Sequence, residues 1–275
     1  MATVMLVHGM FLNPRSWQLW KEFFERRGYD CIAPAWPMHE GDPGDLRAHV
    51  PAGFNALSLD DVVQHMESIA AEHEDLILVG HSVGGLIVQK LISKGVGRLG
   101  VAMCSMPPAG LFNPDSPALR ALTRTMREHK PISMDLDTFY EVYGNTMHRL
   151  DSEAAWHRYA MPGCERILRD CVSGPGRIDT SAPHVPLLFV AGDQDCIIPP
   201  AVCQKNADAY SDEDSRTDYV EFANRGHFIQ GQAHWQEVAC YIDGWIRDVD
   251  AVARQFTRRS TVERPRIALS EALLN

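Results

Sequence analysis

The residues of this chain with the clearest capacity for chemistry surround a serine between two glycines, in the run 80–84 (GHSVG). A serine hydroxyl becomes a useful nucleophile when an imidazole removes its proton and a carboxylate orients that imidazole. The run follows 76–79, which is typical of a buried strand, and precedes 85–92, where apolar residues recur at helical spacing. Small residues permit the sharp strand-to-helix turn that exposes such a serine. We therefore interpret Ser82 as a nucleophile, the alternative being a tight turn that merely contains a serine.

The partners of this serine should follow it in the order carboxylate, then histidine, each just past the end of a strand. Asp193 and Asp195 both come directly after the predicted strand 186–191, and this position does not decide between them. His227 combines the right order, a position just past the predicted strand 217–222 and a preceding glycine. Most of the other histidines fall in loops, in surface helices, in a helical insertion or at the opposite end of the sheet. His227 is therefore the candidate base.

An oxyanion hole needs backbone N–H groups directed at the negative oxygen of the reaction intermediate. One such group follows the nucleophile immediately and belongs to Val83, where a helix N-terminus adds positive partial charge. The second is expected in the loop after the first strand, where Gly9 permits close approach of the backbone and Met10 supplies the N–H. The adjacent His8 is interpreted as a packing and hydrogen-bonding residue, not as a base.

Strand and helix patterns alternate along most of the chain. This predicts an α/β fold with a mainly parallel sheet of about six strands and helices on both faces. The predicted strands are 3–8, 29–33, 76–79, 99–105, 186–191 and 217–222. The predicted helices are 14–27 (entered through an Asn13 cap), 57–72, 85–92, 200–210 and 233–249. Residues 34–55, rich in Pro, Gly, Asp and His, are expected to form a long loop.

The alternation breaks between the fourth and fifth strands, where only helical patterns occur. They cover 117–128, 136–143, 152–159 and 165–171. Ligands bind outside the carboxyl ends of the strands in open α/β sheets, so we interpret 107–185 as a helical cap over that edge. The core is then 1–106 with 186–250. The tail, 251–275, carries five arginines and a short apolar end, and is expected to be solvated. The alternative is docking of that end on the same or another subunit, as in a homodimer.

Taken together, these motifs resemble the α/β-hydrolase superfamily over roughly residues 1–249. The resemblance rests on His8-Gly9, the 80–84 run, the segment 192–199 (GDQDCIIP) and Gly226-His227. It implies that Asp195, rather than Asp193, is the acid. Because the chain starts at what would be the family's third strand, it is similar to the six-stranded subgroup. That subgroup contains plant methylesterases, hydroxynitrile lyases and many small bacterial and fungal hydrolases.

Aromatic and sulfur-containing side chains concentrate in the predicted cap and indicate an apolar acyl or alcohol pocket. They are Phe139, Tyr140, Tyr143, Met147, Trp156, Tyr159 and Met161. Trp36, Met106 and Phe228 each follow a predicted strand end and could complete the pocket walls. The substrate-binding candidates are Phe11, Trp36, His81, Met106, Trp156 and Phe228. Simple packing of the cap on the core is the alternative for each cap residue.

The amino-acid composition argues against some classes of binding partner. With 26 basic and 36 acidic residues the formal charge is -10, which argues against a nucleic-acid surface and against binding to anionic membranes. The N-terminus lacks the features of a signal peptide, and no apolar run is long enough to span a bilayer. Seven cysteines, an odd number without a CxxC pair, indicate reduced thiols in a cytoplasmic protein.

No cofactor or metal is expected. The GxGxxG spelled by residues 95–100 lies between a helix and a strand instead of between a strand and a helix, so it is interpreted as a loop. There is no HExxH, no P-loop and no cysteine–histidine set with zinc spacing.

The preferred hypothesis is a serine hydrolase that cleaves a carboxylic ester of a small, fairly apolar molecule through an acyl-enzyme on Ser82. A second hypothesis keeps the site but uses His227 as the base of a C–C or C–N bond lyase or a cyclase. No lysine is compellingly placed for a cyanide-type lyase. A third is a receptor or pseudoenzyme that uses the capped pocket to bind a ligand.

Overall fold

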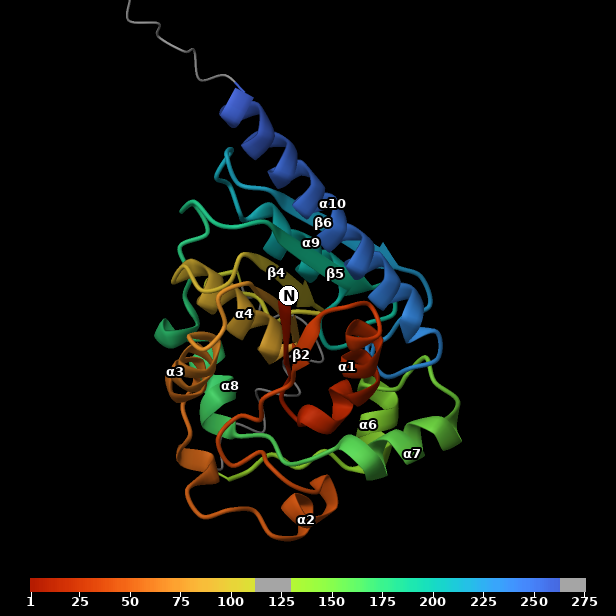
Figure 1. Cartoon of the computed structure of the whole chain (residues 1–275). Helices are drawn as coiled ribbons and strands as arrows, with labels where there is room; N and C mark the ends of the chain where they lie inside the picture. Colours follow the sequence, from red (N-terminus) through yellow and green to blue (C-terminus); the bar gives the residue numbers. More distant parts are fainter. Residues whose placement is uncertain (112–129, 263–275) are drawn as a thin grey trace, which may run out of the picture.

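A six-stranded, all-parallel sheet organises the computed structural model, which describes residues 1–111 and 130–262 (Figure 1). The strand order is β2-β1-β3-β4-β5-β6. The strands are β1 (Thr3–Val7), β2 (Asp30–Ile32), β3 (Leu76–His81), β4 (Leu99–Met103), β5 (Leu187–Gly192) and β6 (Thr217–Phe222). The predicted fold class is confirmed. All six strands lie where the sequence pattern placed them, to within a few residues at their ends.

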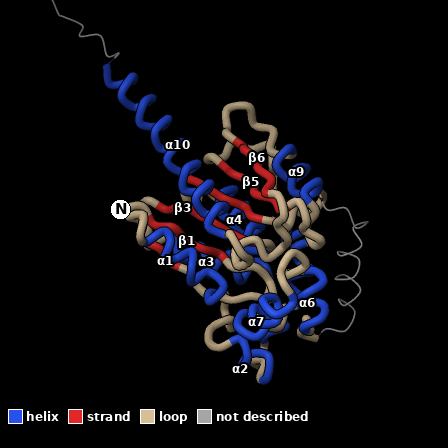
Figure 2. The backbone as a smooth tube through the Cα atoms, turned by 90° about the vertical axis from the view of Figure 1, so that its right-hand side faces the viewer, coloured by secondary structure: helices blue, strands red, loops and turns tan. Residues whose placement is uncertain are grey.

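Helices cover both faces of the sheet, because alternate side chains of the central strands are apolar on both sides. Val4 and Leu6 of β1 pack with α1 (Gln18–Glu25) and α10 (Trp235–Val262) on one face. Met5 and Val7 pack into the core on the opposite face. The helices of that face are α3 (Leu59–Ala70), α4 (Val83–Ser93) and α9 (Pro200–Asp208). Figure 2 shows the strands running between these layers.

The chain between β4 and β5 forms a helical insertion, consistent with a cap. Its described part contains α6 (Leu136–Val142), α7 (Arg149–Tyr159), α8 (Glu165–Cys171) and a 3-10 turn at Gly174–Gly176. The helix predicted at 117–128 lies outside the described residues. In both views α6 and α7 lie near the end of the molecule opposite the projecting end of α10 (Figures 1 and 2).

The segment 34–55, predicted to be a loop, contains a short helix, α2 (Pro43–Ala48). Asp42 caps it by accepting the Gly44 N–H at 2.7 Å. A helix of this length is too short to produce a recognisable apolar repeat, so the pattern did not reveal it. Arg47 joins α2 to the end of α7, donating to the carbonyls of Trp156, His157 and Ala160.

The last helix continues past its predicted end at 249, as far as Val262. The stretch 245–262 contains neither glycine nor proline, and Pro265 is the next residue of either kind. Nothing local therefore interrupts the helix. The boundary of the tail drawn at 251 falls inside α10, and residues 263–275 lie outside the described part. Figure 1 shows the far end of α10 projecting beyond the sheet.

All seven cysteines are free. Within 1–111 and 130–262, no helix combines the length and the apolar character needed to cross a bilayer.

His39 gives the stability of the fold a specific pH dependence. Its ring is buried against Phe54 at a centroid distance of 5.0 Å, and burial lowers its pKa to about 4. The unfolded chain, with a pKa near 6.5, binds more protons than the folded one between these values. Stability is therefore complete above about pH 6.5 and falls as the pH drops toward 4, by about 3 kcal/mol for this group. Urea unfolding at pH 7 and pH 5 measures the loss.

The His39→Asn variant isolates the contribution of this ring. Its unfolding free energy should change less between pH 7 and pH 5 than that of the wild type. The exposed His49, changed in the same way, should leave the wild-type pH dependence intact. Equal pH slopes for wild type and His39→Asn would rule out this origin.

Candidate active site

Ser82 occupies the strained turn between β3 and α4. Its φ is 56°, a left-handed value that is uncommon for a residue with a side chain. The turn is held from both sides, because Ser82 N–H donates to the Met103 carbonyl at 2.9 Å and the Met106 N–H donates to the Ser82 carbonyl at 3.0 Å. Ser82 is buried, with 6% of the residue exposed. Such local strain persists only where surrounding contacts enforce it.

Gly84 is required where α4 crosses the end of β1. A Cβ at this position would come within 3.0 Å of the carbonyl oxygens of Val7 and His8. Gly84→Ala is expected to lower the unfolding free energy by about 1–3 kcal/mol, because backbone has to move. Denaturant unfolding measures the change.

Gly244 is the matched control for Gly84. It is exposed in α10, and a Cβ there meets nothing within 4 Å. Gly244→Ala is expected to raise the unfolding free energy by about 1 kcal/mol through helix propensity alone. A Gly84→Ala protein as stable as the wild type would contradict the steric argument.

Ser82, His227 and Asp195 lie in one hydrogen-bonded line. The Nε2 atom of His227 lies 3.0 Å from Ser82 Oγ, and its Nδ1 atom lies 2.8 Å from Asp195 Oδ2. All three residues are buried. Each follows the carboxyl end of a strand: Ser82 follows β3, Asp195 follows β5 and His227 follows β6. With Nδ1–H donating to the carboxylate, Nε2 is left as an acceptor for the serine proton.

The turn after β5 explains why Asp195, and not Asp193, meets the histidine. Oδ1 of Asp195 accepts the N–H groups of Ile197 and Ile198, both at 2.8 Å, which leaves Oδ2 directed at His227. Asp193 instead accepts the Arg225 N–H at 3.2 Å. The choice that the family resemblance implied agrees with this geometry.

The two residues predicted to supply the oxyanion hole lie in segments next to Ser82. Val83 is the first residue of α4, so its N–H belongs to the unpaired first turn of that helix. A Cβ placed on Gly9 would lie 2.9 Å from Ser82 Cβ, which shows how close the loop carrying Met10 runs. Among the described residues, neither the Met10 nor the Val83 N–H donates to a backbone carbonyl outside helices and strands.

His8 and His81, both fully buried, support the site instead of opening into it. His8 accepts the Trp36 N–H at its Nε2 atom, 3.2 Å away, and its ring stacks on Trp36 at 4.5 Å. His81 donates from Nε2 to the His227 carbonyl at 2.7 Å, and its Nδ1 atom accepts from Gln230 at 3.2 Å. Burial lowers the pKa of both rings well below the usual range, so both are neutral.

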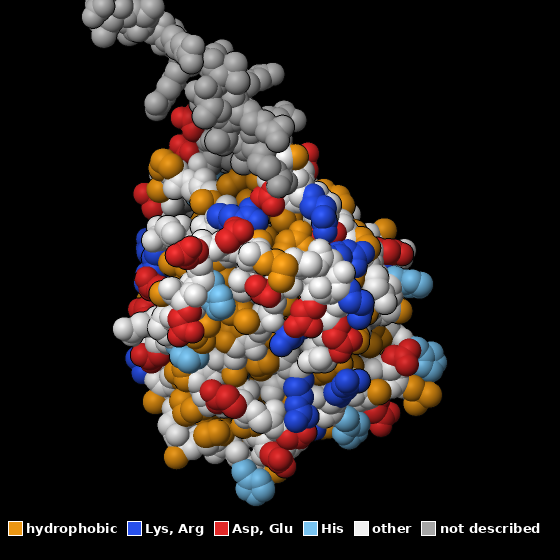
Figure 3. Space-filling view, viewed as in Figure 1, with side chains coloured by type: hydrophobic (Ala, Val, Ile, Leu, Met, Phe, Trp, Pro, Cys, Tyr) orange, Lys and Arg blue, Asp and Glu red, His pale blue; other side chains and the backbone are white. Residues whose placement is uncertain are grey.

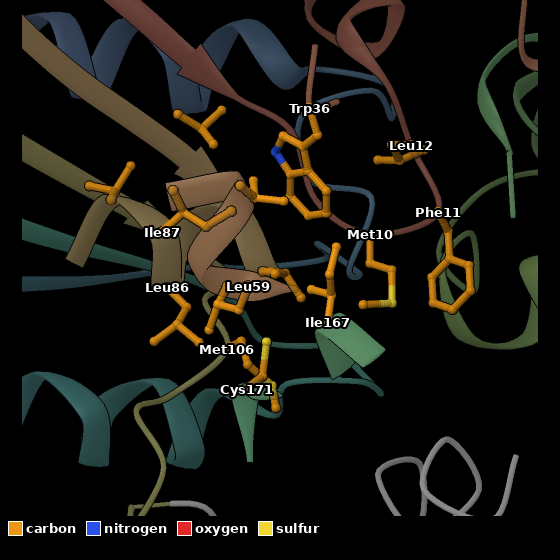
Figure 4. Close-up of a cluster of buried hydrophobic side chains, with 14 of the residues drawn as sticks. Met10, Phe11, Leu12, Trp36, Leu59, Leu86, Ile87, Met106, Ile167 and Cys171 are labelled. Carbon is orange, nitrogen blue, oxygen red and sulfur yellow. The ribbon is translucent and has the colours of Figure 1, made fainter. Parts of the chain in front are cut away.

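The remaining predicted substrate-binding residues belong to one apolar cluster or pack against it. Figure 4 shows Met10, Phe11, Trp36 and Met106 in one buried apolar cluster, together with Ile167 and Cys171 of α8. Phe228 is also buried, with its ring 5.8 Å from that of Tyr159.

Trp156 also packs against this cluster, but its polar contacts lie elsewhere. Its Nε1–H donates to the Met134 carbonyl at 2.9 Å, and the Arg47 guanidinium lies 4.3 Å from the ring centroid. These contacts are with the insertion and with α2.

Several residues near the site escaped the sequence analysis. Gln232 accepts the Gly226 N–H at 3.1 Å, and Gln230 fixes the tautomer of His81. The Cys104 thiol lies beside the Asp195 carboxylate, and burial raises its pKa well above the usual range. Glutamine and cysteine carry no motif that distinguishes such roles, so no sequence signal could have found them.

One group of side chains in the described part has the composition of a metal site. Ligand atoms of Cys104, Asp195 and His227 lie within 4.8 Å of one another. Two of these groups are already paired with each other at 2.8 Å, and all three are buried.

On the face seen in Figure 3, acidic and basic side chains are interspersed and form no single basic patch.

Comparison with known proteins agrees with this architecture. Residues 4–239 match the alpha/beta hydrolase family. No curated protein sequence matches the chain. Similar solved structures include a methylesterase, MES16, from Arabidopsis (12% identity, TM-score 0.66, covering 90% of this chain and 99% of that one). A monoacylglycerol lipase from Paleococcus ferrophilus is 19% identical, with a TM-score of 0.66 and coverage of 90% and 94%. Polyneuridine aldehyde esterase is 14% identical, with a TM-score of 0.64 and coverage of 88% and 98%. At these identities, the similarity to the solved structures shows that the chain shares their fold and nothing further.

Proposed function

The chain belongs to the alpha/beta hydrolase family, and on this basis we propose that it is a serine hydrolase acting on a carboxylic ester of a small, fairly apolar molecule. The observation that carries the proposal is the continuous line from Ser82 Oγ through the His227 ring to the Asp195 carboxylate, at 3.0 and 2.8 Å. A serine at an elbow, a histidine accepting from it and a buried carboxylate behind are the groups that acyl transfer requires.

In the first half of the proposed reaction, Ser82 Oγ attacks the ester carbonyl carbon while Nε2 of His227 removes its proton. Asp195 stabilises the imidazolium that forms. The carbonyl oxygen becomes negatively charged and accepts the N–H groups of Met10 and Val83. Nε2 then returns the proton to the alcohol, which leaves as the C–O bond breaks. The acyl group remains on Ser82.

In the second half, water takes the place of the alcohol. His227 removes a proton from the water, the hydroxide attacks the acyl carbon and the same two N–H groups hold the new oxyanion. Collapse of this intermediate returns the proton to Ser82 and releases the carboxylic acid.

The apolar substrate class is supported by the side chains around the elbow. Phe11 follows the proposed oxyanion donor Met10, Met106 is hydrogen-bonded to the Ser82 backbone, and Phe228 follows the base. All are buried in one apolar cluster. Pockets lined in this way bind ligands through burial of hydrocarbon, with a few polar groups that fix orientation.

A fluorophosphonate probe tests the proposal directly. It should label the protein once, at Ser82, as located by peptide mass mapping. Ester and thioester substrates of increasing acyl length should then be hydrolysed, with a preference for small apolar groups. A folded protein that neither reacts with the probe nor cleaves any ester would be a binding protein. Turnover of a retro-aldol or cyclisation substrate, with all esters left intact, would indicate the lyase or cyclase alternative.

A further inference from the structure

The turn between α6 and α7, residues 143–146, contacts all three loops that form the candidate site. We name these residues the cap turn. They belong to the helical insertion, far in sequence from Ser82, Asp195 and His227. Simple packing of an insertion on the core would give apolar contacts, whereas the cap turn makes directed hydrogen bonds.

Tyr143 bridges the oxyanion loop and the His227 loop. Its hydroxyl donates to the Met10 carbonyl at 2.8 Å, and its own carbonyl accepts the Phe228 N–H at 3.1 Å. Its ring is perpendicular to that of His227 at 4.7 Å and stacks on Phe139 at 5.2 Å. Tyr143 is buried, and its hydroxyl also lies next to the Ser82 side chain. Because burial raises the pKa of this hydroxyl, it stays protonated and remains a donor.

The next residues of the cap turn reach the Asp195 loop and, a second time, the His227 loop. Asn145 Nδ2 donates to the Gln194 carbonyl at 2.8 Å, directly before Asp195. The Thr146 hydroxyl donates to Gln232 Oε1 at 3.1 Å. The same oxygen accepts the Gly226 N–H at 3.1 Å, directly before His227.

We propose that the cap turn is a positioning device, which holds the loops of Met10, Asp195 and His227 in one relative arrangement so that the site is complete only when the cap is seated. The inference rests on the proposed function for its catalytic consequence. Its structural content, that Tyr143, Asn145 and Thr146 restrain these loops, stands independently. Tyr143 is the central positioning residue because it reaches two loops at once.

Tyr143→Phe removes the hydroxyl and keeps the ring contacts and the backbone bond to Phe228. With a small ester such as p-nitrophenyl acetate, kcat should fall by about 10- to 100-fold while KM changes by less than about threefold, since the loss is one of alignment and not of ground-state binding. Hydrogen–deuterium exchange in the peptide spanning residues 8–13 should become several-fold faster.

Tyr210→Phe is the matched control. Its hydroxyl is hydrogen-bonded to Gln89 Oε1 at 3.0 Å and to none of the three loops. It should leave kcat and exchange at residues 8–13 unchanged. Thr146→Val, which removes a hydroxyl at nearly constant shape, should accelerate exchange around residues 224–228.

Two results would overturn the inference. One is a Tyr143→Phe protein with kcat within twofold of the wild type, and the other is unchanged exchange at residues 8–13. The exchange measurement does not depend on any reaction. If Ser82 proved unreactive, the proposed function would fail while the exchange result still decided whether the cap turn restrains the loops.

Discussion

Replacing Ser82 by alanine is expected to lower kcat for ester hydrolysis by roughly 10⁴-fold or more and to abolish labelling by a fluorophosphonate. The substitution removes the atom that forms the acyl-enzyme, whereas the backbone N–H groups proposed as oxyanion donors remain. Those groups and substrate binding determine the residual activity that the variant keeps. Steady-state kinetics with a chromogenic ester and intact-protein mass spectrometry after probe treatment measure the two effects.

Ser16→Ala is the control for removal of a buried serine hydroxyl. Ser16 lies in the turn before α1, where its hydroxyl donates to the Asn13 carbonyl at 2.8 Å and is not hydrogen-bonded to Ser82, Asp195 or His227. The variant should lose about 1 kcal/mol of stability and keep full activity. A Ser82→Ala protein that hydrolyses esters at the wild-type rate would eliminate the acyl-enzyme mechanism.

Asp195→Asn is the second substitution with a large expected effect, again roughly 10⁴-fold in kcat. The Ile197 and Ile198 N–H groups bind one carboxylate oxygen, so the amide oxygen of asparagine would take that place. Its NH₂ group would then face Nδ1 of His227 and donate to it. The ring proton would move to Nε2, where it blocks removal of the serine proton. Steady-state kinetics across a pH series measures the loss.

Asp193→Asn provides the matched control two residues away. Asp193 accepts the Arg225 N–H and has no contact with His227, so this variant should retain activity within a few-fold of the wild type. Comparable losses in the two variants would show that the carboxylate roles are assigned wrongly.

The fold could be predicted from the sequence because its signals are local. Buried runs such as 187–192 and the alternation of strands with helices fix a parallel sheet without knowledge of any long-range contact. The residues at the strand ends follow from the same reasoning, because parallel strands bring their carboxyl ends to one edge. Ser82 and His227 were found in this way.

The choice of Asp195 over Asp193 could not be made by position alone. Both follow β5, and the outcome depends on a turn in which two later N–H groups bind one carboxylate. The family resemblance supplied this information, and the bonds from Ile197 and Ile198 give its physical reason.

The contacts of the insertion could not be predicted from local sequence patterns. Tyr143 was expected only as one of several aromatic residues lining a pocket. Its bonds to the Met10 and Phe228 backbones depend on how the insertion folds back over the sheet edge, which periodicity does not report. Arg47 and α2 escaped for a related reason, since their partners at the end of α7 lie over a hundred residues away.

The order of the strands has a consequence for biosynthesis. The elements that present Ser82 and Met10 leave the ribosome before the insertion does, since β1 to β4 end at Met103. The acid and the base arrive with β5 and β6, after the whole insertion has been synthesised. Joining β5 to β4 then requires closure of a long connection, which is entropically costly and slow for parallel strands. A nascent chain therefore holds its nucleophile unactivated until β6 and the His227 loop have emerged and docked.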